Sequence, residues 1–331
     1  MESIQKSLKG SEIGEAQQHG SLAMLPLLAS SEGGVDYLLA GEALRSGVAR
    51  VTEVSESGHV PELKFSNLAD LPVLILEGEE LVGAKQNRTT NLTILAPPRT
   101  TIVIPVSCVE AGRWHYQSRE AEVSERVHMA SGRAAKAATV SYHLHHEGVA
   151  HADQGRVWDD IGCAAQCLGV HSPTRAMSDI FESHRPRIDE FVAAFRPVER
   201  QVGALFAIAD APAGFDLFAH AATLRAMLPK LVRSYAVDAI RVDDGSGSKP
   251  GAGRARAFLD AAATATVESY PAVGLGTTVR LSADGLVGGG LVHDDRLVHL
   301  AAFAVERQSS ADRDNGRGLA SLSARRRSYR H

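Results

Sequence analysis

The chain lacks the features that would place it in a membrane or outside the cell. It has no apolar run of about 18 residues, the length that a membrane-spanning helix requires, and its N-terminus lacks the apolar core of a signal peptide. Its cysteines number three, and an odd number argues against a disulfide framework and for a reducing compartment. We therefore expect a cytoplasmic protein that makes no contact with a membrane.

Net charge and aromatic content are also low. The formal net charge is −4, so no overall field attracts nucleic acid, and we expect no specific nucleic-acid binding. Aromatic residues make up 5% of the chain, so aliphatic residues and alanine must fill most of the core. At 331 residues the chain can form one large core or two modest ones. The sequence leaves a homo-oligomer open.

Common motifs for cofactors and metals are missing too. Neither the phosphate loop GxxxxGK[ST] nor the metal motifs HExxH and CxxC occurs, and no GxGxxG follows an expected strand. One segment is rich in histidine and contains His128, His143, His145, His146 and His151. A metal site needs such side chains to converge, and without a partner motif we favour solvated loop histidines. We predict no metal and no cofactor.

The spacing of apolar residues predicts strands at both ends of the chain and helices between them. Strands are expected at 22–28, 35–39, 48–54, 63–65, 73–76, 81–82, 90–94 and 101–106. Helices are expected at 153–170, 176–183, 188–195, 224–239 and 254–263, with a hairpin at 203–217 and a meander at 277–304. The fold class is therefore α+β: a mostly antiparallel β N-terminal half, a helical middle, and a mixed α/β C-terminal part that ends in a β-meander.

We divide the chain into four parts. Residues 1–20 are a polar N-terminal tail, and residues 306–331, which end in ARRRSYRH, are expected to be a disordered basic tail. Residues 21–152 would form a β-rich subdomain, in which 131–150 is a helix or a long loop. Residues 153–305 would form a helical and mixed α/β subdomain packed on the first.

The stretch from Leu74 to Tyr116 carries two dense polar clusters, each where expected strands end. The first consists of Glu79, Glu80, Lys85, Gln86, Asn87 and Arg88, and the second of Cys108, Glu110, Arg113 and Trp114. Strands hold such side chains rigidly, and turns expose them to a ligand. If the two loops fold against each other, these residue types predict a site for a small anionic molecule.

The residue types suggest individual roles at this site. The ligand contacts would be Lys85, Gln86, Asn87, Arg88, Arg113 and Trp114. The cations among them would hold phosphate, since arginine offers a planar fork to such groups, and the indole would stack on a ring. Glu79 or Glu110 is the candidate acid–base residue, and Cys108 is a candidate nucleophile only if its thiol is exposed near a base. Whether any reaction takes place stays open.

The same clusters have a second interpretation. Polar residues at hairpin ends are commonly solvated, and pairs of opposite charge across strands stabilise a sheet. The clusters would then be salt bridges that fix strand register, and the protein would be a non-catalytic scaffold or protein-interaction module. The two interpretations differ in whether Glu79, Lys85, Glu110 and Arg113 line one hollow or scatter over exposed edges.

The segments EGEELVGAKQNR and IPVSCVEAGRW resemble the ARG-and-rhodanese-phosphatase-associated domain family, a bacterial family without an established activity. The resemblance covers residues 20–305 and includes the segments DQGRVW, QVGALFAIADAPAGFDLF, LPKLVRSYAVDAI and LVHLAAF. It implies that Gln154, Lys230 and Arg233 also contact the ligand. The family name records an association with ADP-ribosylglycohydrolases and phosphatases, which implies by context alone a nucleotide-like or ADP-ribose-related ligand.

Overall fold

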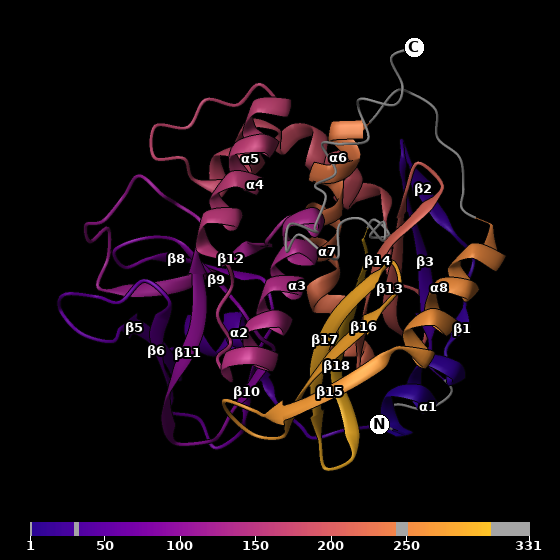
Figure 1. Cartoon of the computed structure of the whole chain (residues 1–331), viewed down its shortest axis with the longest axis horizontal. Coiled ribbons are helices and arrows are strands. Elements are labelled where there is room, and N and C mark those ends of the chain that lie inside the picture. The colour runs from indigo at the N-terminus through magenta and orange to yellow at the C-terminus, as the bar shows by residue number, and fades with distance from the viewer. Residues whose placement is uncertain (1, 30–32, 243–250, 306–331) are drawn as a thin grey trace.

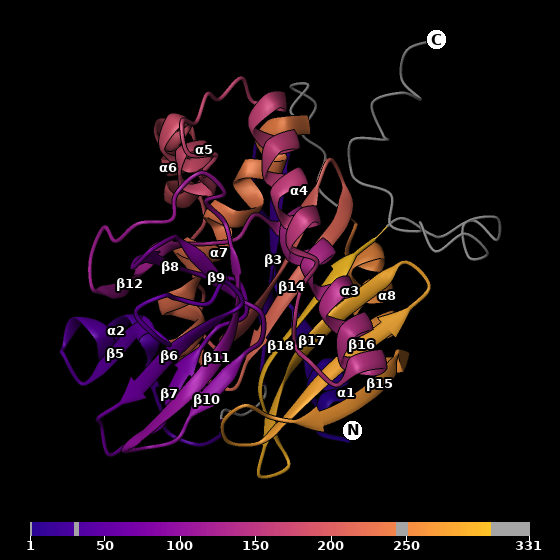
Figure 2. The same ribbon diagram turned by 60° about the vertical axis from the view of Figure 1, so that its left-hand side comes forward.

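The structure is a computed structural model that describes residues 2–29, 33–242 and 251–305. A large antiparallel sheet and a closed barrel lie side by side, with helices packed on and between them (Figure 1, Figure 2). The predicted α+β class is therefore confirmed, as are the N-terminal strands and the C-terminal meander. Within the described ranges no helix is both long and apolar enough to cross a membrane. The predicted tail at 306–331 lies outside the described residues.

Six strands of the N-terminal half close into the barrel, in the order β11-β6-β5-β12-β8-β9. Their bounds are β5 Ala49–Glu53, β6 Glu62–Asn67, β8 Glu79–Gly83, β9 Arg88–Thr90, β11 Thr100–Cys108 and β12 Glu120–Val127. Alternate residues of a strand point to opposite faces, and the apolar ones on the inner face, such as Val51, Phe65 and Ile104, form one buried cluster.

A small three-stranded sheet shares this core. Its strands are β4 Leu38–Leu39, β7 Val73–Ile75 and β10 Ile94–Ala96, and the short helix α2 Ala40–Arg45 packs with them. The single strand expected at 90–94 is divided, because β9 belongs to the barrel and β10 to the small sheet. The division falls at Asn91. Its side-chain amide donates to Ala150 O, and its Oδ1 accepts from the Ser107 hydroxyl.

Pro105 lies within β11 and marks neither an edge nor a bulge of the barrel. β11 pairs with β6 as far as Pro105 and with β9 from Val106 onward, so the proline stands where the strand changes partners. A proline has no N–H to donate to a neighbouring strand. Pro105 takes part in the sheet through its carbonyl, which accepts the Asn91 N–H.

The large sheet has the order β1-β3-β13-β14-β18-β17-β16-β15, with β2 paired to β3. The bounds are β1 Glu12–Ile13, β2 Gln17–His19, β3 Leu22–Leu28, β13 Gln201–Ile208, β14 Ala211–Phe218, β15 Thr266–Pro271, β16 Thr277–Ala283, β17 Leu286–His293 and β18 Arg296–Ala304. β3 comes from the N-terminal half but pairs with β13 along its whole length. The two halves of the chain therefore share one sheet.

Helices cover both faces of this sheet. They are α1 Glu2–Gly10, α3 Ala130–Glu147, α4 Gln154–Cys167, α5 Met177–Ser183, α6 Arg185–Ala194, α7 Ala221–Val242 and α8 Ala252–Thr264. Neighbouring residues of β13 show the two faces: Phe206 packs in the core under α7, whereas Leu205 packs in the core under α1 and α8. α7 continues through Pro229 without ending there.

The spacing of apolar residues in α4 does not decide where its Trp158, Cys163 and Cys167 lie, and all three are exposed. The helix buries Val157, Ile161 and Ala164 instead, and residues at this spacing occupy a single face. Strands β12 and β15 were not predicted, because their charged and polar residues give no clear alternation.

Candidate functional site

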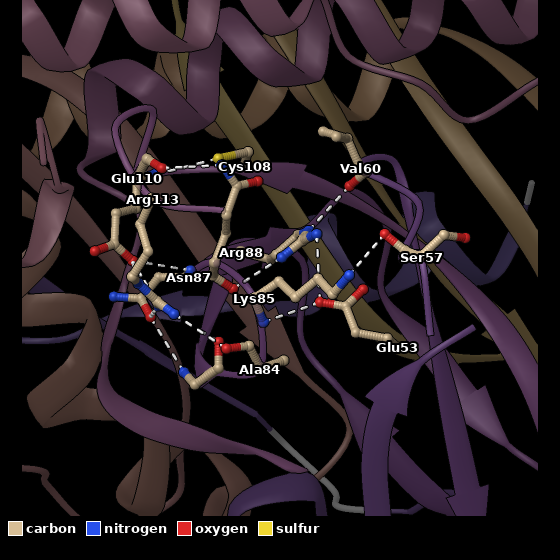
Figure 3. Close-up of polar contacts among 12 residues, drawn as sticks. Glu53, Ser57, Val60, Ala84, Lys85, Asn87, Arg88, Cys108, Glu110 and Arg113 are labelled. Carbon is tan, nitrogen blue, oxygen red and sulfur yellow. Dashed lines mark hydrogen bonds and ion pairs between the residues drawn. The ribbon is translucent and has the colours of Figure 1, made fainter. Parts of the chain in front are cut away.

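Three connections at one end of the barrel bring the two predicted clusters together. They join β5 to β6, β8 to β9, and β11 to β12. The Arg113 guanidinium, from the third, donates to Ala84 O at 3.0 Å and to Asn87 Oδ1 at 2.9 Å, both in the second. Figure 3 shows Arg113 and Asn87 on the left of the resulting cluster and Lys85 on its right. The structure therefore brings the two loops into one cluster, in which Arg113 bonds the carbonyl of the residue before Lys85.

Glu110 is held by the same contacts. Its Oε2 lies 2.7 Å from Arg113 Nη2 and also accepts the Asn87 N–H at 3.2 Å. Gln86 Nε2 donates to the Glu110 carbonyl at 3.2 Å. Glu110 and Arg113 are each 6% exposed, so these side chains fill the space between the loops rather than line a hollow. In this part of the cluster the predicted ligand contacts serve as internal braces.

Arg88 lies beneath the cluster and is fully buried. Its Nε donates to Val60 O at 3.0 Å and its Nη1 to Gln86 O at 2.8 Å. Its Nη2 lies 3.6 Å from Glu53 Oε1, yet has no hydrogen-bond partner among the described residues. Burial lowers the pKa of Arg88, while Glu53 opposes that shift. One terminal nitrogen of this buried guanidinium therefore has no hydrogen-bond acceptor among the described residues.

Lys85 occupies the exposed side of the cluster. Its backbone N–H donates to Glu53 Oε1 at 3.0 Å and its Nζ to Ser57 O at 2.8 Å. The ammonium lies 5.5 Å from the Trp114 ring centroid and 5.0 Å from that of Tyr116, distances typical of cation–π contact. Trp114 is 45% and Tyr116 46% exposed. Two aromatic rings and a cation thus form a surface, which we call the Lys85–Trp114 face.

The Lys85–Trp114 face lies directly above Arg88. The Arg88 guanidinium carbon is 5.5 Å from the Trp114 ring centroid. Gly58, in the first connection, has φ +75°, and a Cβ there would lie 3.2 Å from Trp114. Glycine is therefore suited to this turn both by its backbone conformation and by the indole that packs against it.

Cys108 is not placed as a nucleophile requires. Its side chain is fully buried, and burial raises the pKa of its thiol. Its backbone is held by Gln154, whose Oε1 accepts the Cys108 N–H and whose Nε2 donates to the Cys108 carbonyl, both at 2.8 Å. The condition that we set for a nucleophile, a thiol exposed near a base, is not met. Gln154 thus reaches the cluster, but its side-chain amide is used to join α4 to β11.

Glu79, Lys230 and Arg233 lie apart from the cluster. Glu79 begins β8, and the cluster lies beyond the other end of that strand, about 13 Å along it at 3.3 Å per residue. Its Oε1 pairs with Lys230 Nζ of α7 at 2.8 Å, with both residues buried. Arg233, one turn further along α7, pairs with Asp189 of α6 at 2.7 Å.

Glu79 and Glu80 were predicted as part of the first cluster, but they and the neighbouring Glu77 each bind a cation of a different element. Glu77 pairs with Arg280 of β16 at 3.2 Å, and Glu80 with Arg126 of β12 at 2.6 Å. Glu77–Arg280 thus joins this segment to the large sheet and Glu79–Lys230 joins it to α7, whereas Glu80–Arg126 links two neighbouring strands of the barrel. Buried carboxylates of this kind require such partners, because an unpaired buried charge is strongly unfavourable.

Sequence reasoning missed two side chains of the site. Glu53 is buried at the end of β5, on the same inward face as Val51. A carboxylate at an inward position of a strand could have identified it from the sequence. Tyr116 lies two residues after Trp114 and could have been included for that reason. Ser57 contributes only its carbonyl, which no side-chain pattern could indicate.

The histidines of the 128–151 segment make separate contacts. His143 Nδ1 bonds His151 O at 2.8 Å, and His145 pairs with Glu268 at 2.8 Å. Across the described ranges, no group of at least three His, Cys, Asp or Glu side chains is arranged to hold a metal ion. His128 is buried, so it is not one of the solvated histidines that we expected.

Comparison with known proteins adds a family. The model of the ARG and Rhodanese-Phosphatase-superfamily-associated Protein domain matches residues 10–303, a range that contains the barrel, the large sheet and the whole candidate site. Searches of curated proteins and of solved structures gave no match. The family description records an association and not an activity. The chain belongs to the ARG and rhodanese-phosphatase-superfamily-associated protein domain family.

Proposed function

We propose that this protein binds a small anionic, nucleotide-like molecule on the Lys85–Trp114 face. The observation that carries the proposal is the placement of the Lys85 ammonium against two exposed aromatic rings, above a buried guanidinium whose Nη2 has an ion-pair partner in Glu53 but no hydrogen-bond partner among the described residues. An aromatic surface can stack on a base, and a lysine beside it can neutralise phosphate. The family's association with ARG proteins supports an ADP-ribose-related ligand within this class.

Arg88 would supply the second contact. Trp114 covers its guanidinium, so the indole would have to move before a phosphate oxygen could reach Nη2. Guanidinium–phosphate hydrogen bonds are among the stronger polar contacts in proteins, because both partners are charged. The cluster beneath, from Asn87 to Arg113, would keep both loops in position without touching the ligand.

The proposal is one of binding and does not include a reaction. Glu110 is occupied by Arg113, Glu79 lies in the core with Lys230, and Cys108 is buried with a raised thiol pKa. None of these groups offers a free acid, base or nucleophile next to the Lys85–Trp114 face. The catalytic roles predicted for them stay untested.

A thermal-shift panel tests the proposal. ADP-ribose, AMP, ribose 5-phosphate and inorganic phosphate would be compared, and we expect the nucleotides to raise the melting temperature more than phosphate alone. Lys85→Ala and Trp114→Ala should each remove most of the shift. Lys9→Ala and Tyr142→Ala, which alter exposed residues of α1 and α3, serve as matched controls and should keep it. Full shifts in both site variants would rule the site out.

A second candidate, a scaffold without a ligand, is favoured by one observation. Most charged side chains of the cluster are engaged within the protein, as in the pairs Glu110–Arg113 and Arg88–Glu53. On this view Trp114 and Tyr116 would contact a protein partner, since exposed aromatic residues are common in interfaces. A panel in which no nucleotide changes the melting temperature of the wild-type protein would favour this candidate.

A further inference from the structure

α3 carries two buried cations into the space between the barrel and the large sheet. Figure 1 shows the helix between the barrel strands and strands β17 and β18, and Figure 2 shows it in front of the meander. Arg133 points to the sheet, where both terminal nitrogens bond the carboxylate of Asp216 on β14. Lys136, one turn further on, points to the barrel, and it is 1% exposed.

Lys136 differs from the cations around it because its partners are uncharged. Its Nζ donates to Thr89 Oγ1 at 3.2 Å and to Thr90 O at 2.5 Å, both on β9. The nearby ion pairs, Arg133–Asp216 and Arg280–Glu77, do not include it. Two acceptors suit the two N–H groups of a neutral amine, whereas an ammonium has a third to satisfy.

Charged groups face Lys136 from several elements. Arg133 lies on its own helix, Glu77 follows β7, Arg280 comes from β16, and His128 lies just before α3. Burial is the main cause that lowers the pKa of Lys136 to about 7; Glu77 opposes the shift, and the two arginines add to it. Burial also lowers the pKa of His128 well below its usual value, so that imidazole is neutral here.

β9 connects this lysine to the candidate site. The strand is only Arg88–Thr90: Arg88 lies beneath Trp114, while the next two residues accept the bonds from Lys136. We propose that Lys136 is a proton-dependent latch between α3 and β9, through which protonation in the barrel–sheet interface changes the geometry of the Lys85–Trp114 face. The proposal concerns regulation of that face and rests on the proposed function only in treating it as the binding surface.

The latch would work because the neutral and the protonated Lys136 side chain need different surroundings. The neutral amine satisfies both threonines and leaves α3 seated against β9. The buried ammonium is cut off from water and repelled by Arg133 and Arg280, and the attraction of Glu77 only partly offsets this, so protonation favours withdrawal of the side chain from β9. Withdrawal frees Thr89 and Thr90, and Arg88 beside them is then less firmly held. Linkage is reciprocal, so an anion bound near Arg88 would in turn change the affinity of Lys136 for its proton.

Trp114 fluorescence tests the latch without any ligand. The chain has two tryptophans, so Trp158→Phe leaves Trp114 as the only reporter. We expect its emission to change with a midpoint near pH 7 and the change to be absent when Lys136→Met is added. All other titratable groups are the same in both proteins, so only the difference between the two curves counts. Identical curves would overturn the proposal, whatever the outcome of the ligand panel.

A measurement on the wild-type protein guards against a Lys136→Met variant that fails to fold. With lysine side chains and tryptophan indoles isotopically labelled, NMR would follow both groups from pH 6 to about 10, a range that spans the shifted lysine pKa and ends just below the ordinary one. We expect one lysine to titrate far below the others and the Trp114 indole signal to move along the same curve. A Trp114 signal that does not follow that lysine, or the absence of a lysine with a low pKa, would overturn the proposal.

Discussion

Among the residues of the site, Lys85 and Arg113 differ in what they leave free for a ligand. The Arg113 guanidinium is 6% exposed and is used by Glu110, Asn87 and three carbonyls. Lys85 binds a single carbonyl and lies against two exposed rings. Both cations were predicted as phosphate ligands; we propose that role for Lys85 alone, because Arg113 braces the two loops.

The three cysteines provide a prediction at this scale. Thiolates and not thiols are alkylated, and the thiol of Cys108 is buried with a raised pKa, whereas Cys163 and Cys167 are exposed. Brief treatment of the native protein with iodoacetamide at neutral pH should therefore modify Cys163 and Cys167 and leave Cys108 unmodified. Peptide mass spectrometry reads the result, with urea-unfolded protein as the control in which all three react. Equal labelling of Cys108 in the native protein would contradict the placement of β11.

Much of the site's composition could be predicted from sequence, but not its arrangement. Lys85, Arg88 and Trp114 were identified from residue type and from their position at strand ends. That Glu79 belongs to the core could not be predicted, because its partner Lys230 lies on a helix far along the chain and only the tertiary fold brings them together. The carboxylates of Glu77 and Glu80 are explained in the same way, by Arg280 and Arg126.

At the scale of elements, the contact between α4 and β11 supports the cluster from behind. Gln154, the first residue of α4, makes both hydrogen bonds of its amide to the backbone of Cys108. Cys108 pairs in turn with Arg88 across the barrel ladder. The helix is thereby linked, through one strand, to the strand that carries the buried guanidinium.

Removal of this amide should weaken the connection. Two hydrogen bonds are lost in Gln154→Ala, and we expect a loss of roughly 1–3 kcal/mol in the free energy of unfolding. Exchange of the Cys108 amide hydrogen should also become faster. Gln166→Ala, which alters an exposed glutamine of the same helix, is the control and should change neither quantity. A Gln154→Ala protein indistinguishable from that control in both measurements would show that the contact does not hold α4 in place.

Elements with clear periodicity were predicted well, and those without it were not. β3, β13 and the strands of the meander are apolar over several residues and were placed correctly. β12 contains three glutamates, and one face of the strand is exposed to solvent. Its sequence is therefore typical of a solvated segment. The closure of the barrel could not be predicted at all, because it depends on pairings such as that of β12 with β8.

For the whole molecule, a buried polar centre joins the two bodies. Asp216 of β14 accepts both arms of Arg133 and also lies 3.2 Å from His299 Nε2, while His299 Nδ1 bonds Thr93 Oγ1 at 2.8 Å. Burial alone would raise the pKa of Asp216, but Arg133 and His299 lower it to about 2. The carboxylate is therefore charged throughout the neutral range, and it balances a guanidinium that has no access to solvent.

Loss of the Asp216 charge should destabilise the whole fold. Asp216→Asn leaves Arg133 buried without a counter-charge, and we expect a loss of about 3–5 kcal/mol in the free energy of unfolding, measured by urea denaturation. The matched control is Asp70→Asn, because Asp70 pairs with Arg99 on the surface and exposed pairs contribute little. Equal stability of the two variants would mean that the Asp216–Arg133 pair is not what holds the barrel to the sheet.

The binding proposal is tested most directly by the indole signals of Trp114 and Trp158 in a proton–nitrogen NMR spectrum, recorded as ADP-ribose is added. We predict that the Trp114 signal shifts in a saturable manner and that the Trp158 signal, from an exposed residue of α4, moves little. With Lys85→Ala the same additions should leave Trp114 nearly unchanged. A saturable shift at Trp158 alone, or no shift at either indole while the protein remains folded, would contradict the account.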